Sequence, residues 1–121
     1  EAARTLEFNG INSTVVFDVG VAGLWRLTEK IEEIKSYPIV IAVAGMDAAL
    51  ISVLGGLVPG LLIAVPTSTG YGAAHDGETA LAASLVSCAP GVVVCNIDNG
   101  YGAACAAIRA IQAASLMYTE N

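Results

Sequence analysis

The sequence has few charged residues, and very few of them are basic. Charged side chains make up 13% of the 121 residues and hydrophobic ones 55%, and the 5 basic residues leave a net charge of −6. So few cations cannot form the basic patch that binding to nucleic-acid phosphates needs, which excludes that class of partner. A small domain with few charges must expose apolar atoms, which favours burial against further copies of itself or against another domain.

The sequence also lacks the residue clusters of a metal site. It has 1 histidine and 3 cysteines, without a CxxC pair, so a zinc site is not expected. An odd number of cysteines without a secretory signal indicates reduced thiols and a cytoplasmic protein. Cys95 and Cys105 fit small buried hydrophobic residues, whereas Cys88 stands beside Pro90 and Gly91 in a loop. Cys88 is either a buried structural thiol, the more frequent case, or a reachable nucleophile.

No apolar segment is long enough to span a membrane. The longest run without a charged residue, from Ala48 to His75, is broken at Gly55-Gly56 and again at Pro59-Gly60. Each apolar piece is shorter than the ~20 residues that a membrane helix needs. We therefore expect a soluble protein.

What the sequence has instead is a regular alternation of strand and helix patterns. Apolar, β-branched runs predict strands at residues 14–20, 37–45, 61–66 and 91–98. Helical patterns cover residues 1–10, 22–37, 46–58, 77–88 and 102–118, and the tail 119–121 is expected to be loose. This order predicts one α/β domain over residues 1–121, with a parallel sheet in a three-layer α/β/α arrangement of flavodoxin-like or Rossmann-like type. Doubly wound folds normally open on a strand and this chain opens on a helix, so we expect its first strand to be missing.

Glycine-rich loops follow the predicted strands, at residues 18–23, 43–49, 65–77 and 96–104. The carboxyl ends of parallel strands meet at one edge of a sheet, where ligands bind. The pentapeptide GYGAA occurs in two of these loops, at Gly70 to Ala74 and at Gly100 to Ala104. Glycines let backbone N–H groups approach a ligand and helix N-termini favour anions, so one interpretation is a phosphate or ribose site. The other is that the glycines only make tight turns for helix packing. The tyrosines of the two copies are likewise either core residues or stacking platforms.

The predicted topology places Cys88 apart from these loops. Cys88 lies between a helix and the next strand, and such loops gather at the opposite edge of a parallel sheet. It therefore joins a site at the ligand edge only if it serves a neighbouring subunit or if its loop wraps over.

Four segments carry a resemblance to a known family. DVGVAGLWRL, VAGMDAALISVLGGLV, IAVPTSTGYGAA and SCAPGVVVCNIDNGYGAA resemble, in this order, the C-terminal domain of the LarB family of pyridinium-3,5-biscarboxylic acid mononucleotide synthases. That domain is similar to the aminoimidazole ribonucleotide carboxylase/mutase (PurE) family. The resemblance implies a PurE-like fold and an enzyme.

The reaction implied by the resemblance is a carboxylation coupled to a hydrolysis. LarB-family enzymes add carbon dioxide, supplied as such or as bicarbonate, to carbon 5 of the pyridinium ring of nicotinic acid adenine dinucleotide. They also hydrolyse its phosphoanhydride, which releases AMP and starts synthesis of the nickel-pincer nucleotide cofactor of lactate racemase. No tightly bound cofactor is implied, and a need for Mg²⁺ stays open.

The resemblance also assigns roles to residues. The family's covalent nucleophile falls on Cys88, and its acid–base residue falls on Asp47, where members commonly have Glu. Arg26 is retained and is expected to hold a phosphate or carboxylate, whereas Trp25 stands where members commonly have His. Loop position and resemblance together indicate a set of substrate-binding residues: Asp18, Gly20, Arg26, Gly45, Met46, Thr67, Ser68, Gly70, Tyr71, Gly72, Asn96, Asp98, Asn99 and Gly100.

Finally, the resemblance implies a larger molecule. Family members continue upstream into a strand, a phosphate-binding loop and an N-terminal domain. The PurE relatives are octamers with active sites between subunits, so a homo-octamer is expected. Two alternatives stay open: an aminoimidazole ribonucleotide carboxylase or mutase, which needs no thiol, and a non-catalytic nucleotide-binding module that assembles an oligomer.

Overall fold

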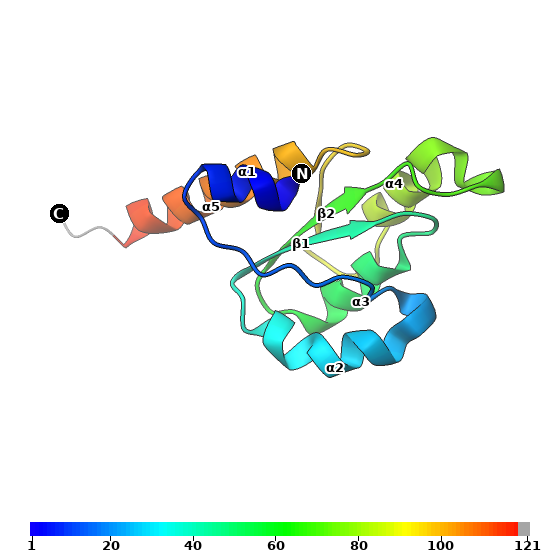
Figure 1. The fold of residues 1–121 in the computed structure, drawn as a ribbon, viewed down its shortest axis with the longest axis horizontal. Coiled ribbons are helices and arrows are strands. Elements are labelled where there is room, and N and C mark those ends of the chain that lie inside the picture. The colour runs from blue at the N-terminus through cyan, green and yellow to red at the C-terminus, as the bar shows by residue number, and fades with distance from the viewer. Residues whose placement is uncertain (119–121) are drawn as a thin grey trace.

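Three parallel strands form the centre of the fold in the computed structural model, which describes residues 1–118 (Figure 1). The tail 119–121, predicted to be loose, lies outside the described residues. In chain order the elements are α1 (Ala2–Phe8), the 3₁₀ helix η1 (Val21–Gly23), α2 (Leu24–Lys35), β1 (Ile39–Ala44), α3 (Ala49–Leu57), β2 (Leu61–Pro66), the 3₁₀ helix η2 (Gly72–Gly77), α4 (Glu78–Leu85), β3 (Val93–Val94) and α5 (Gly100–Met117).

The sheet has the order β1-β2-β3, with β2 in the middle. β1 pairs with β2 along its full length, from Ile39 opposite Leu61 to Ala44 opposite Pro66. The two residues of β3 pair with Ile63 and Ala64 on the other side of β2. Because β2 is flanked on both edges and covered on both faces, its residues from Leu62 to Pro66 are all buried. The α/β fold class with a parallel sheet is confirmed.

Helices cover both faces of the sheet and give it three layers. Alternate residues of β2 point to opposite faces. Ile63 and Val65 pack with residues of α1 and α5, whereas Leu62 and Ala64 pack with residues of α2, α3 and α4. Figure 1 shows α1 and α5 on one side of the strands and α2 and α3 on the other. The helices predicted from periodicity are all present, with ends shifted by a few residues.

The strand predicted at residues 14–20 is wrong. No element is assigned there, and β1 pairs with no strand but β2 in the described chain. A strand requires a neighbour that receives its backbone hydrogen bonds, and this segment has none, although its residues favour pleated structure. Val15 and Phe17 are consequently exposed, at 51% and 83%. Val19 packs against the core and anchors the end of the segment.

The last strand is shorter than the predicted 91–98 and comprises only Val93–Val94. Beyond it the chain still follows β2, because Cys95 N donates to Ala64 O (2.9 Å) and Asp98 N donates to Pro66 O (2.8 Å). The positive φ of Asp98, +60°, then turns the backbone away from the extended conformation. The predicted strand therefore divides into a short ladder and a loop bonded to β2.

Within residues 1–118, no helix combines the length and the hydropathy that a transmembrane span requires.

Candidate functional site

Three strand-to-helix loops are hydrogen-bonded to one another at the carboxyl edge of the sheet. They follow β1 (residues 45–48), β2 (residues 67–71) and β3 (residues 95–99). Met46 N donates to Thr69 O (3.2 Å), which joins the first loop to the second. Ser68 N donates to Asp98 Oδ1 (2.9 Å), which joins the second to the third. Figure 1 shows this edge at the points of the β1 and β2 arrows, where α2 also begins.

Strained backbone is concentrated at this edge. The residues other than glycine with positive φ all lie in connections that lead into a helix: Asp18 (58°), Met46 (54°), Ala48 (52°), His75 (42°), Asp76 (52°) and Asp98 (60°). Each such residue costs roughly 1–3 kcal/mol, and such strain clusters at ligand sites, where the surroundings enforce it. Met46 and Ala48 have no side-chain oxygen that would ease the left-handed conformation. This pattern favours a functional edge over loops that merely turn.

Two glycines of the predicted site have a packing role. A Cβ on Gly45 would lie 2.7 Å from both Thr67 Oγ1 and Thr69 O. A Cβ on Gly70 would lie 2.7 Å from Ala74 Cβ, and the φ of Gly70 is +149°. Both glycines therefore let loops approach each other, as the tight-turn interpretation holds. Gly20 and Gly72, in contrast, have no atom within 4 Å of their Cβ positions, so they face open space.

Three polar side chains predicted to face a ligand form hydrogen bonds with the protein instead. Asn96 Oδ1 accepts from Ile97 N (2.8 Å), and Asn99 Oδ1 accepts from Gly102 N (2.9 Å) and caps α5. The hydrogen bonds from the Ser68 side chain and backbone hold the pKa of the exposed Asp98 carboxyl below its usual value. Gly100 is buried under α1, since a Cβ there would lie 3.2 Å from Ala2 N. The loop after β3 thus supports the site more than it lines it.

Arg26 lies in the first turn of α2 and is held by Asp18, in the segment that leads into this helix. Arg26 Nε donates to Asp18 O (2.8 Å) and lies 3.5 Å from Asp18 Oδ2. Its guanidinium carbon lies 5.2 Å from the centroid of the exposed Trp25 ring. Asp18 thus compensates part of the charge of Arg26, and the remaining guanidinium N–H groups are the donors that an anion would meet.

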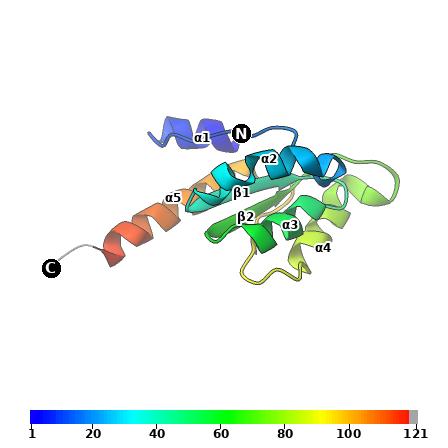
Figure 2. The ribbon, with the colours of Figure 1, turned by 90° about the horizontal axis from the view of Figure 1, so that it is seen from below.

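The predicted catalytic residues lie at different places along α3. Asp47 is exposed just before α3, and its Oδ1 accepts from Ala49 N (3.3 Å). Cys88 is an exposed free cysteine in the α4–β3 loop. That loop packs on α3, and Figure 2 shows it on the α3 side of the sheet. No hydrogen bond joins Cys88 to Asp47 in the described chain.

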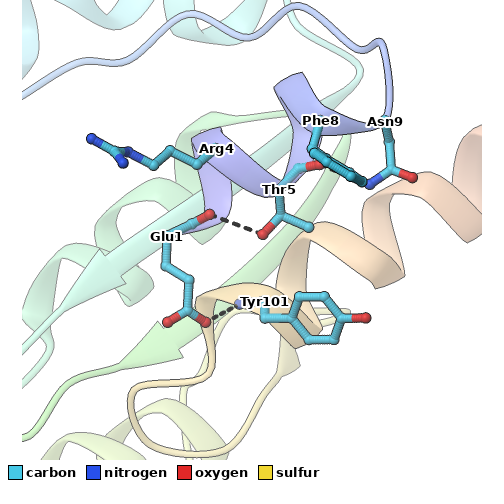
Figure 3. Close-up of a pocket in the computed structure, with 6 residues that line it drawn as sticks. All are labelled: Glu1, Arg4, Thr5, Phe8, Asn9 and Tyr101. Carbon is cyan, nitrogen blue, oxygen red and sulfur yellow. Dashed lines mark hydrogen bonds between the residues drawn. The ribbon is translucent and has the colours of Figure 1, made fainter.

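The tyrosines of the two GYGAA copies are exposed, so neither is a core residue. Tyr71 is 81% exposed and Tyr101 60%. Tyr101 borders a surface groove between α1 and α5, shown in Figure 3, that is lined by Glu1, Arg4, Thr5, Phe8, Asn9 and Tyr101. Glu1 Oε1 accepts from Tyr101 N (2.7 Å) and occupies the start of α5. This groove contains none of the predicted catalytic residues.

His75 is the residue that the sequence reasoning left out of the site. It is exposed in η2 with a left-handed backbone, beside Asp76 in the same conformation. A single histidine has no pattern around it, so its place in the long connection after β2 is the only signal in the sequence. Within residues 1–118, no three His, Cys, Asp or Glu side chains are grouped as a metal site would need.

Comparison with known proteins identifies the family. An uncharacterized protein of Methanocaldococcus jannaschii is 44% identical over 105 residues, which cover 85% of this chain and 40% of that protein. The chain thus spans two fifths of the length of this curated relative. The model of the AIR carboxylase family matches residues 1–120, almost from end to end. Together with the three-layer parallel fold, this match shows that the chain belongs to the AIR carboxylase family.

Proposed function

We propose that this domain is the catalytic domain of a LarB-type carboxylase/hydrolase that acts on nicotinic acid adenine dinucleotide. Its products are the dicarboxylated pyridinium mononucleotide and AMP, and carbon dioxide or bicarbonate is the co-substrate. The observation that carries the proposal is the exposed, unpaired thiol of Cys88 within the SCAPG segment. Cys95 and Cys105 are half-buried, and burial raises the pKa of the Cys95 thiol, which lowers its reactivity.

The chemistry explains why a thiol is needed. A pyridinium cation is electron-poor and does not attack carbon dioxide. Addition of the Cys88 thiolate to the ring converts it into an enamine-like nucleophile, which then forms the new carbon–carbon bond. Asp47 takes the proton from carbon 5, and expulsion of the thiolate restores the aromatic ring. Water attacks the phosphoanhydride in a separate step, and AMP leaves.

The nucleotide is proposed to bind along the carboxyl edge. Thr67, Ser68, Tyr71 and Gly72 line the connection after β2, where Ser68 and Tyr71 are exposed and the space at Gly72 is open. Hydroxyls and backbone N–H groups of such a loop suit a phosphate, and an exposed tyrosine offers a face on which a base or ring stacks. Arg26, in the first turn of α2, supplies a positive charge.

The separation of Cys88 from Asp47 supports an assembly with shared sites. We propose a homo-octamer in which the Cys88 loop of one subunit completes the carboxyl-edge site of another. Exposed apolar side chains, among them Val43, Trp25 and Leu116, provide surface that such an assembly would bury. The upstream strand and phosphate loop stay predictions, and the unpaired edge of β1 is where a further strand would pair.

The family match favours one alternative, an aminoimidazole ribonucleotide carboxylase or mutase. That reaction needs no thiol, because its substrate is already an electron-rich, enamine-like ring. A non-catalytic nucleotide-binding module is the second alternative.

Product analysis distinguishes these functions. Incubation with nicotinic acid adenine dinucleotide and labelled bicarbonate should release AMP and label the mononucleotide. Cys88→Ala should lower the rate by a factor on the order of 10³ or more, as expected for loss of a nucleophile. Cys105→Ala, a substitution in the alanine-rich α5, is the matched control and should retain the rate.

Other outcomes would support the alternatives. Full turnover by Cys88→Ser, or turnover of aminoimidazole ribonucleotide alone, would support the purine-type enzyme. AMP bound without turnover would support the binding module.

A further inference from the structure

The loop that carries Cys88 is held on α3 by a pair of serines. Ser52 Oγ of α3 lies 2.8 Å from Ser87 Oγ, and the contact is partly buried. Ser87 Oγ also accepts a hydrogen bond from Ala89 N (3.2 Å). The Ser87 hydroxyl thus closes a turn around Cys88, and Ser52 ties this turn to a rigid helix.

A second contact lies one turn further along the helix. A Cβ on Gly55 would lie 2.5 Å from Ala89 Cβ and 3.2 Å from Val92 Cγ2. Any side chain at this position would push the loop away from α3. The next residue, Gly56, has no atom within 4 Å of its Cβ position. The loop therefore rests on one glycine of the pair and not on the other.

We infer that Ser52 and Gly55 are positioning residues for the Cys88 thiol. They fix the residues on either side of Cys88, while Cys88 itself stays exposed. The same helix begins next to Asp47, so α3 is the element that holds both proposed catalytic groups in place. This inference rests on the proposed role of Cys88 as the nucleophile.

The two adjacent glycines provide a matched test. Gly55→Ala and Gly56→Ala make the same change in the same helix, so a gain in helix propensity is common to both. A displacement of a reactive group by about 1 Å costs on the order of 10²-fold in rate. Gly55→Ala should therefore lower kcat for AMP release by roughly 10- to 100-fold with little change in KM, whereas Gly56→Ala should retain both.

The serine contact is tested by rescue. Ser52→Ala removes the partner of Ser87 and should slow formation of the Cys88–substrate adduct, measured by intact mass after rapid quenching. Ser52→Thr keeps a hydroxyl at the same position and should restore the rate. Loss of rate in both variants, or in neither, would contradict a positioning role for this hydroxyl.

Alkylation of Cys88 by iodoacetamide separates failure of this inference from failure of the proposed function. If the unmodified protein forms no substrate adduct, the proposed function is wrong. The alkylation rates still measure how closely the Cys88 loop packs on α3. A loop lifted from α3 should expose its thiol more, so Gly55→Ala should react faster than Gly56→Ala. Equal alkylation rates and equal kcat values in the two variants, both with unchanged circular dichroism, would overturn the inference.

Discussion

At the scale of single residues, Asp98 has a role that charge or loop position alone does not indicate. Its carboxylate accepts the hydrogen bond of Ser68 N and links two loops whose residues are 30 positions apart. The hydrogen bonds from Ser68 lower the pKa of Asp98, so the charged form is favoured in the folded protein. A lowered carboxyl pKa contributes stability above its unfolded value of about 3.9, and this contribution is lost as the pH falls through the folded value.

We therefore predict that Asp98→Asn reduces thermal stability near neutral pH and that the deficit shrinks progressively as the pH falls below about 4. Asn tolerates the left-handed backbone and keeps an acceptor, so the change isolates the charge. Asp76→Asn is the control, because Asp76 is also left-handed, and no hydrogen bond within residues 1–118 joins its carboxylate to another loop as that of Asp98 is joined to Ser68. Melting temperatures of the three proteins from pH 7 to pH 3 provide the measurement. A deficit that is equal at all pH values would contradict the assignment.

The sequence predicted which residues lie in the loops at the carboxyl edge, but it did not predict which hydrogen bonds they form. Glycine-rich loops after β-branched runs were sufficient to place Thr67, Ser68 and Gly72 after β2. The hydrogen bonds that Asn96 and Asn99 accept from nearby backbone N–H groups depend on local backbone angles, which their residue types permit but do not require. The left-handed conformations of Met46 and Ala48 have no signal in composition, because these residue types normally avoid that region.

At the scale of elements, burial separates the strands that were predicted well from those that were not. The run 61–66 was predicted to the residue because it is covered on both faces and paired on both edges. The run 14–20 is also rich in β-branched residues, yet it forms no strand because none lies beside it. The β-propensity of a run tells how well its residues fit a pleated sheet. It does not tell whether a neighbouring strand is present to pair with the run.

This difference predicts a contrast in hydrogen exchange. The amides of residues 14–19 should exchange within seconds, whereas those of Leu62 to Val65 in β2 should exchange only through global unfolding. Mass spectrometry of peptides from the two segments measures both. Protection of 14–19 equal to that of β2 would show that the segment pairs with a strand in solution.

At the scale of the whole molecule, the proposal of a site shared between subunits follows from where the two proposed catalytic groups lie. Asp47 lies at the carboxyl edge, whereas Cys88 lies in a helix-to-strand loop packed along α3. α3 rises about 1.5 Å per residue, so Gly55, beneath the Cys88 loop, is about 9 Å from Ala49 along the helix. Thiol and base must act on one ring within a few ångströms of each other. A site shared between subunits satisfies this requirement without unfolding the loop.

Complementation tests the shared site directly. Cys88→Ala and Asp47→Asn should each be inactive alone, but co-expressed chains should form mixed assemblies with intact sites. If each site takes Asp47 from one subunit and Cys88 from its neighbour, about a quarter of the sites in a random 1:1 mixture have both groups. AMP release should recover to roughly that fraction of the unmodified rate, and each variant co-expressed with itself should show no recovery. Absence of recovery in assemblies shown by native mass spectrometry to contain both chains would place thiol and base in the same subunit, and the α4–β3 loop would then have to move to the carboxyl edge.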